Sequence, residues 1–277
     1  MNKVPVNTRD YFLTQESFKL IFNEQYQCYQ TDPVPLNLNT YYDSKAYISH
    51  TDGKKGWFEF LYQSAKGITL FGKKRLICKL FPEKKKLKVL DIGCGTGDFL
   101  KVLPKSYLKF GVEPSTLARE LAKQKNIRCY SSSDVVEEKF DLISMWHVLE
   151  HVPNLEKQFE TFDRLLTTRG KILIAVPNYE SYDAKYYGKL WAAYDVPRHL
   201  WHFSKKSIHT IANSNGYKIE KIVPMWLDSF YVAMLSEKYK KTSFSFFKGF
   251  FVGLASNISA FSSKNTSSLI YVLEKTI

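Results

Sequence analysis

Short apolar segments alternate with amphipathic segments along most of the chain after residue 86. Residues 154–166 place large apolar side chains on one helical face, and Gly170 is expected to end this helical region. Ser204 precedes a second such pattern and is a residue type that caps helices. The apolar segments predict buried strands at 87–92, 108–112, 127–130, 140–145, 171–176, 217–223 and 268–274.

This alternation predicts an α/β fold. It is a Rossmann-like, seven-stranded, mostly parallel sheet with helices on both faces, to which N-terminal and C-terminal cap segments are added. We expect residues 1–80 to be the N-terminal cap or appendage and residues 81–277 to be the domain that holds the sheet. Residues 226–265 separate the last two strands and are expected to be an insertion. Ligands of such sheets bind at the carboxyl ends of the strands, here after Ile92, Val112, Met145 and Val176.

A glycine-rich turn follows the first of these strands. Gly93, Gly95 and Gly97 stand at alternate positions, where missing side chains let a ligand approach the backbone. Asp91 ends the strand, and Glu113 ends the next strand 22 residues later, where a carboxylate can accept both hydrogen bonds of a ribose diol.

The charge at this turn indicates which cofactor it accepts. A dinucleotide fingerprint places a glycine at position 98, but the residue is Asp98, whose negative charge opposes a pyrophosphate at the helix start. A cofactor with an amino-acid head and a sulfonium is cationic, so Asp91 and Asp98 both favour S-adenosylmethionine over NAD.

Three segments together closely resemble class I S-adenosylmethionine-dependent methyltransferases: VLDIGCGTGDF, GVEPS and FDLISMWHVLEHV. The resemblance covers residues 86–222, about half of the chain. It implies that the Asp91 turn holds the methionine part of the cofactor and that Glu113, followed by Pro114, holds the ribose. It further implies that Ser132, Ser133 and Trp146 surround the adenine. The full set of implied cofactor residues is Asp91, Gly93, Gly95, Gly97, Glu113, Pro114, Ser132, Ser133 and Trp146.

Histidines at the same edge are candidate bases. His147 and His151 follow a strand, and histidine can accept a proton near neutral pH. In the methyltransferases that this sequence resembles, the Leu-Glu-His segment often orders the turn instead, with its imidazole hydrogen-bonded to the backbone. The spacing H-x-x-E-H also occurs in a zinc peptidase group, but there it needs one helical face, whereas His147 adjoins a strand.

A metal is a further alternative at this turn. Some ubiquinone-pathway O-methyltransferases and small-RNA 2′-O-methyltransferases place E-x-x-E-H around a divalent cation, and His147 stands where their first Glu would be. A histidine there weakens the oxygen shell that magnesium prefers, so no metal ligand is assigned.

An aromatic stretch, 179–194, leads into PRHLWHFS and resembles the substrate-side loop of the subgroup with a PRHLxxFS signature, which is similar to ubiquinone-pathway methyltransferases. Its rings either form an acceptor pocket or pack a lid onto the sheet. The PRHLWHFS segment also supplies a third candidate base, so the candidates are His151, His147 and His199. Tyr41, Tyr47 and His50 are weaker candidates for closing the cofactor site from the N-terminal side.

Charge and composition bear on partners. The chain has 40 Lys and Arg against 27 Asp and Glu, a net charge of +13, which suits nucleic acid or anionic lipid. No recognised RNA-binding module is visible, and the basic runs 73–75, 84–86 and 238–241 are interpreted as solvated faces or linkers. Residues 244–261 are too interrupted for a membrane span, so they form either an interfacial helix on anionic lipid or, as we favour, a helix packed over the sheet or at a dimer seam.

The expected function is methyl transfer from S-adenosylmethionine to an oxygen, nitrogen or carbon of a small-molecule or lipid-like acceptor. The alternatives are a non-catalytic protein that binds this cofactor and an RNA methyltransferase. The absence of a signal-peptide pattern and of CxxC pairs predicts a cytoplasmic protein, with peripheral membrane contact through 244–261 left open, as is the oligomeric state.

Overall fold

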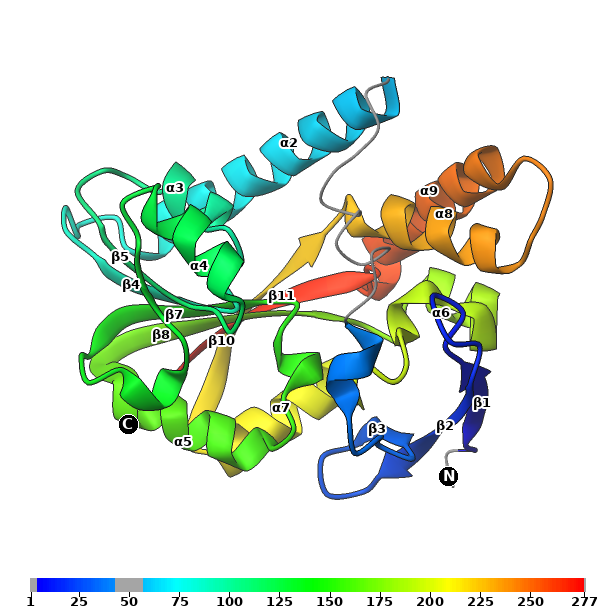
Figure 1. Cartoon of the computed structure of the whole chain (residues 1–277), viewed down its shortest axis with the longest axis horizontal. Coiled ribbons are helices and arrows are strands. Elements are labelled where there is room, and N and C mark those ends of the chain that lie inside the picture. Colours follow the sequence, from blue (N-terminus) through cyan, green and yellow to red (C-terminus); the bar gives the residue numbers. More distant parts are fainter. Residues whose placement is uncertain (1–3, 43–56, 277) are drawn as a thin grey trace.

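A central seven-stranded sheet organises the chain (Figure 1). The structure is a computed structural model that describes residues 4–42 and 57–276. The strand order is β10-β11-β8-β7-β4-β5-β6, and only β11 runs antiparallel to its neighbours. The predicted α/β class and mostly parallel sheet are confirmed. The seven strands are β4 Lys88–Ile92, β5 Leu108–Val112, β6 Arg128–Tyr130, β7 Phe140–Trp146, β8 Leu166–Pro177, β10 Tyr217–Met225 and β11 Ser268–Lys275.

The expected end of one helix at Gly170 is wrong. The helix α5 spans Leu155–Leu165, and β8 begins at the next residue, so Gly170 lies inside the strand. Leu166 already has extended backbone and pairs with Phe140 of β7. The two threonines that follow are β-branched and favour extended backbone, so they continue the strand. By contrast, Ser204 caps α7, Lys205–Ser214, with a full capping box, as predicted.

Helices cover both faces of the sheet because alternate strand residues point to opposite sides. On one face, α5 and α7 pack on a core that includes Leu90, Ile143 and Ile172. On the other face, α2 (Trp57–Leu80), α3 (Asp98–Val102) and α4 (Thr116–Lys123) pack on Val89, Leu142 and other strand residues. Figure 1 shows α5 and α7 below the sheet and α2, α3 and α4 above it.

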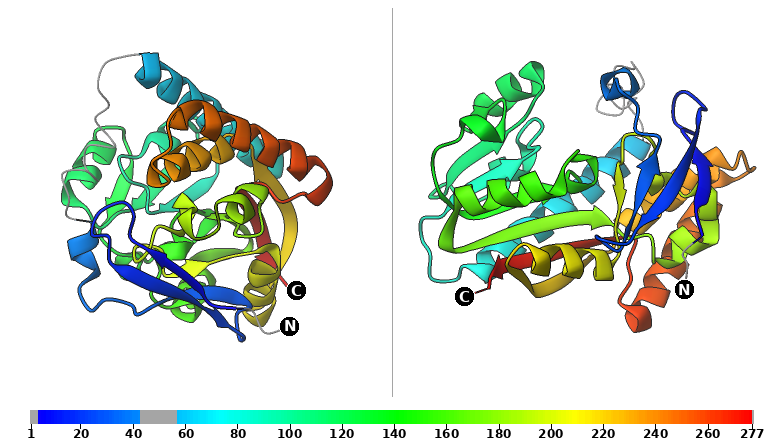
Figure 2. Two further views of the ribbon diagram at one scale, coloured as in Figure 1. Left: turned by 90° about the vertical axis from the view of Figure 1, so that its right-hand side faces the viewer. Right: turned by 90° about the horizontal axis from the view of Figure 1, so that it is seen from below.

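A second, small antiparallel sheet lies beyond the carboxyl edge of the main sheet (Figures 1 and 2). Its strands are β1 Val6–Arg9, β2 Ser17–Asn23, β3 Cys28–Asp32 and β9 Trp201–His202. Since β9 comes from the loop after β8, this sheet fastens the N-terminal segment to the PRHLWHFS loop. Three rings of the aromatic stretch, Tyr187, Trp191 and Tyr194, are buried in a third core between this sheet, α6 (Tyr182–Tyr187) and α8 (Asp228–Tyr239), so they pack these elements together.

Two helices separate β10 from β11. The helix α8 spans Asp228–Tyr239, and α9 spans Ser245–Ser263. The segment 244–261 is therefore helical and packed, but it packs on α8 and α6 instead of covering the sheet. Among the described residues, no helix is long and apolar enough to span a bilayer.

Candidate active site

The glycine-rich turn after β4 is shaped for a ligand. Gly93, Gly95 and Gly97 all have positive φ angles, between 52° and 79°. A Cβ atom at Gly93 would lie 2.4 Å from Val148, and one at Gly97 would lie 2.3 Å from Ile127, so packing requires glycine at both positions. At Gly95, apart from its chain neighbours, no described residue has an atom within 4 Å of the same position. The turn is thus closely packed at its ends and open at its middle residue.

Glu113 lies against this turn. It directly follows β5, and its Oε2 accepts the N–H of Gly95 at 3.0 Å while its Oε1 accepts the N–H of Ser115 at 2.9 Å. Next to it, the carbonyl of Pro114 accepts a hydrogen bond from Arg119 at 2.6 Å. The structure therefore brings Glu113 and the glycine turn together and fixes the carboxylate before any ligand arrives.

The residues expected near the adenine lie at the same edge with other partners. Ser132 and Ser133 follow β6, where the Ser132 hydroxyl caps a short turn by accepting the N–H of Asp134 at 3.1 Å. Trp146 ends β7, and its ring meets that of Phe99 edge to face at 5.1 Å. The indole N–H of Trp146 is buried, and none of the described residues accepts a hydrogen bond from it. Such an unsatisfied donor is costly, which is consistent with a ligand in this region.

Asp98 does not supply the charge expected of it. Its carboxylate forms ion pairs with Lys66 at 2.5 Å and Lys125 at 2.6 Å. Burial raises the pKa of Asp98, but the two lysines lower it by more, so that the result is about 2. Two cations already compensate this carboxylate, so the expectation that Asp98 attracts a cationic cofactor is corrected.

Asp91 is the buried acid at this edge. It is 2% exposed and accepts a hydrogen bond from the Ser144 hydroxyl at 2.6 Å. Burial raises its pKa to about 7, although Ser144 and the ammonium of Lys73 act in the opposite direction. Lys73, from α2, lies with its Nζ 4.0 Å from the centre of the Trp146 ring, and burial lowers its pKa to about 8. Lys73 thus faces the site, and the interpretation of the run 73–75 as a solvated face is wrong for this residue.

His147 is held between two carboxylates. Its Nδ1 lies 3.3 Å from Glu150 and its Nε2 lies 3.1 Å from Asp228, the first residue of α8. Burial lowers its pKa, but the two carboxylates outweigh burial and raise it to about 10. His147 is therefore a cation at neutral pH. In this state it can donate hydrogen bonds but cannot accept a proton, which argues against the expectation that it is a base.

His151 and His199 are arranged in a different way. The Nδ1 of each lies 2.9 Å from a backbone carbonyl, that of Arg198 for His151 and that of Ala193 for His199. The Nδ1 of His151 also lies 3.0 Å from the hydroxyl of Tyr42. Because a carbonyl only accepts, Nδ1 of His199 carries the hydrogen in its contact with Ala193, and a neutral His199 ring presents the lone pair of Nε2. Burial and the neighbouring His151 lower the pKa of His199 to about 4. His199 is therefore neutral near pH 7, with the lone pair of Nε2 available, although the lowered pKa makes it a weaker base than an exposed histidine.

These two histidines adjoin a buried carboxylate. Among the described residues, Glu150, His151 and His199 form a group whose potential ligand atoms lie within 4.8 Å of one another. Glu150 is fully buried, and its Oε2 accepts no hydrogen bond from the part of the chain that the structure describes. Histidines that donate Nδ1–H to backbone and present Nε2 are typical of metal ligands. The three residues can hold a divalent cation that accepts nitrogen ligands, such as zinc, although the sequence assigned no metal ligand.

A cavity of about 690 Å³ opens beside these groups. This volume lies in the range of small-molecule sites. Most of its surface is apolar, and Val232 and Leu235 of α8 and Leu70 of α2 contribute to it. Polar groups lie among these apolar side chains. The polar lining includes Lys73, His147, Asp195, Arg198, His199 and Asp228.

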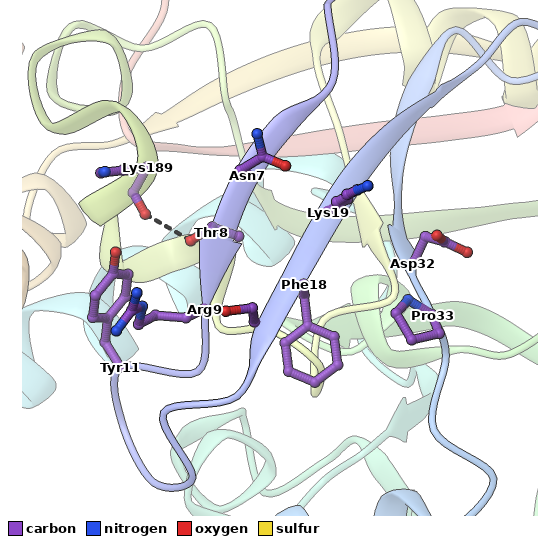
Figure 3. A pocket seen from close by; sticks show the side chains of 10 residues that line it. Asn7, Thr8, Arg9, Tyr11, Phe18, Lys19, Asp32, Pro33 and Lys189 are labelled. Carbon is purple, nitrogen blue, oxygen red and sulfur yellow. Dashed lines mark hydrogen bonds between the residues drawn. The ribbon is translucent and has the colours of Figure 1, made fainter.

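A second cavity, of about 460 Å³, lies on the small sheet (Figure 3). Its lining comes from β1, β2 and the end of β3, and the carbonyl of Lys189 closes one side by accepting the Thr8 hydroxyl at 2.7 Å. Residues predicted for the site do not line this cavity. The carboxyl edge of the main sheet is therefore the candidate active site.

Several residues of this site are not among those that the sequence predicts. The sequence does not reveal the position of Asp228, and the basic run 73–75 predicts that Lys73 faces solvent. Arg198 lies in the segment that the resemblance places on the substrate side, but it is not among the predicted site residues. One signal in the sequence is available for Asp228, which comes shortly after the strand at 217–223 and is the last Asp of the chain. Of the weaker candidates, Tyr41 is buried and donates its hydroxyl to Glu16, while Tyr47 and His50 lie outside the described residues.

Comparison with known proteins defines the class. The family model described as a methyltransferase domain matches residues 69–222, more than half of the chain. The chain belongs to this methyltransferase family. The predicted class, a class I S-adenosylmethionine-dependent methyltransferase, is confirmed by family and fold, and with it the expected cofactor.

Individual relatives agree with this class. An uncharacterised methyltransferase of Alkaliphilus oremlandii is 33% identical over 39% of this chain and 54% of its own length. A ubiquinone/menaquinone biosynthesis C-methyltransferase of Campylobacter jejuni is 28% identical over 33% of this chain and 45% of its own length. The chain thus spans about half the length of the curated relatives it matches.

Solved structures share the fold. The magnesium protoporphyrin IX methyltransferase of Synechocystis PCC 6803, solved with bound S-adenosylhomocysteine, matches with a TM-score of 0.55 at 15% identity. That match covers 85% of this chain and 97% of the other. A putative sarcosine dimethylglycine methyltransferase of Galdieria sulphuraria also has a TM-score of 0.55, at 14% identity, and covers 77% of this chain and 87% of its own.

Proposed function

We propose that the protein transfers a methyl group from S-adenosylmethionine to a small organic acceptor bound in the cavity at the carboxyl edge. The observation that carries this proposal is the adjacency of two parts. The open glycine turn with Glu113 suits the donor, and the cavity beside His147 and His199 suits an acceptor. The comparisons favour neither a non-catalytic binding protein nor an RNA methyltransferase.

The donor side has the groups that this cofactor needs. Glu113 would receive the ribose hydroxyls, Gly95 would let the cofactor approach the backbone, and Trp146 would lie beside the adenine. When bound, the cofactor supplies an electrophilic methyl group on a sulfonium. Asp91, buried beneath the turn, contributes negative charge near that cation once its proton is released.

The acceptor side aligns the nucleophile and excludes water. The apolar surface of the cavity, to which α8 contributes, would position a largely apolar acceptor. Alignment alone accounts for much of the rate of such a transfer. His199 is our candidate for the group that takes the acceptor's proton, because it is neutral and lines the cavity. The cationic His147 would donate a hydrogen bond, and His151, which does not line the cavity, would position the loop through the Arg198 carbonyl.

Calorimetric titration with S-adenosylmethionine, S-adenosylhomocysteine and NAD tests the donor part. We expect micromolar binding of the first two, weakened about ten- to hundredfold in Glu113→Gln because a charged hydrogen bond contributes roughly 1.5–3 kcal/mol. Glu120→Gln, an exposed acid on α4, is the matched control and should bind normally. Binding of NAD alone, or an unaffected Glu113→Gln protein, would contradict the proposal.

The acceptor part is tested by the release of S-adenosylhomocysteine with a panel of phenols, amines and acidic carbon compounds. For an active acceptor, His199→Gln should lower kcat by about a hundredfold or more with unchanged donor affinity if His199 is the base. Unchanged turnover in His199→Gln would remove His199 from the proposal and leave alignment as the remaining contribution.

A further inference from the structure

The helix α9 has its amphipathic pattern inverted. Its small residues face α8: a Cβ atom at Gly249 would lie 2.5 Å from the Cα of Met234, and one at Gly253 would lie 2.8 Å from the Cα of Phe230. Ser256 and Ala260 continue this buried face. The large side chains point outward instead. An ordinary surface helix buries its large apolar residues, so this arrangement needs another explanation.

The outward side chains form a continuous apolar stripe. They recur at intervals of three and four residues, which places them along one side of the helix. At 1.5 Å per residue the stripe is about 26 Å long. Contiguous exposed surfaces of this kind mark interaction sites. The exposed fractions are 76% for Phe244, 60% for Phe247, 63% for Phe251, 39% for Leu254, 61% for Ile258 and 68% for Phe261.

The charge around the stripe has one sign. From residue 238 to residue 273 the sequence has five lysines and no Asp, Glu, Arg or His. All five lysines, at positions 238, 240, 241, 248 and 264, are exposed. Of the two acids in the preceding helix, Glu237 is buried and Asp228 is paired with His147. These five lysines form no ion pair with the residues that the structure describes, so the surface combines exposed aromatic rings with positive charge.

We infer that this face of α9 docks on an anionic phospholipid bilayer, with its aromatic stripe at the acyl boundary and its lysines among the headgroups. A second copy of the chain fits less well, because it would bring these lysines opposite identical lysines. The helix lies on the bilayer and does not cross it, in agreement with the absence of any spanning helix among the residues described. The docking surface is separate from both the cofactor turn and the cavity beside the histidines, since α9 contributes no residue to the turn or to the cavity lining.

Vesicle flotation tests this inference without any enzymatic readout. Wild-type protein should float with vesicles of phosphatidylcholine containing about 30 mol% phosphatidylglycerol, and much less with pure phosphatidylcholine. Phe247→Ser/Phe251→Ser should lower the partition coefficient at least about tenfold, and Lys241→Glu/Lys248→Glu should do so in a salt-dependent way. Leu117→Ser, at a residue 73% exposed on α4, is the control and should bind as wild type does.

Three results would overturn the inference. They are no flotation of the wild-type protein with anionic vesicles, equal flotation of the double Phe variant, and a wild-type dimer in sedimentation that this variant dissociates. Titration of the same variants with S-adenosylmethionine confirms that they are folded. It also separates this inference from the proposed function, because vesicle docking can fail while donor binding is retained, and donor binding can fail while docking is retained.

Discussion

Removing the buried cation of Arg198 should destabilise the protein strongly. Its side chain is 1% exposed, and it lies 2.8 Å from Asp10, which is 0% exposed, and 2.7 Å from Asp195, which is 25% exposed. Breaking a buried pair by removing one partner costs about 3–5 kcal/mol. Asp10 retains backbone N–H donors from residues 12–14, and Asp195 can be hydrated, so we expect the lower end, about 3 kcal/mol, for Arg198→Met.

Urea unfolding, followed by circular dichroism, measures this loss. Arg128→Met is the matched control, because Arg128 is 67% exposed in its ion pair and should lose no more than about 1 kcal/mol. In the Arg198→Met background, Asp10→Asn should cost much less than it does alone, since its partner is already missing. A loss below about 1 kcal/mol for Arg198→Met, or full additivity of the two changes, would refute the reasoning.

The same pair predicts how stability depends on pH. Burial raises the pKa of Asp10, but Arg198 and the backbone donors lower it below the usual value of 3.8. A carboxylate with a lowered folded pKa stabilises the protein above its unfolded pKa, and this contribution disappears as the pH falls through the folded value. In Arg198→Met the folded pKa of Asp10 should rise, so acid unfolding should begin at a higher pH than in the wild type.

Three further outcomes are expected. In NMR titration His147 should stay protonated until about pH 10. The stability that it contributes is therefore complete below its unfolded pKa of 6.5 and is lost as the pH rises through about 10. Asp228→Asn should lower the folded pKa of His147, and an imidazole that titrates near 6.5 in the wild type would contradict the ion pairs. Gly97→Val should abolish donor binding and destabilise the fold, because its side chain would overlap Ile127 at a backbone φ of 79°; calorimetry and thermal unfolding measure both. If Glu150, His151 and His199 hold zinc, the dialysed protein should bind one equivalent of zinc in calorimetry. Glu150→Gln should bind zinc at least about tenfold less tightly. Treatment with a chelator that changes neither the metal content nor the activity would exclude a bound cation.

The local signals were read correctly where short-range physics decides them. The seven strands and the Ser204 cap follow from periodicity and from one side chain that accepts a backbone N–H. Gly170 failed as a helix signal because pairing of Leu166 with β7, a contact made across the sheet, set the backbone earlier. Long-range partners explain the remaining differences: Asp98 is compensated by Lys66 and Lys125, and Lys73 reaches Trp146. No pattern in a single sequence states which distant charges will meet.

The reversed direction of β11 separates the donor and acceptor functions along the chain. Since β11 runs opposite to β8 and β10, Met225 pairs with Ser268 and Ser268 with Pro177, so the segment between β10 and β11 leaves and re-enters the sheet at the carboxyl edge. Changes of length or sequence in that segment alter the acceptor wall and the α9 surface, while the turn after β4 is untouched. In the proposed function, exchange of this one continuous segment therefore changes part of the acceptor wall, while residues such as Lys73 and His199 stay in place. A chimera that carries a relative's segment in place of residues 226–267 should keep donor affinity and change its acceptor.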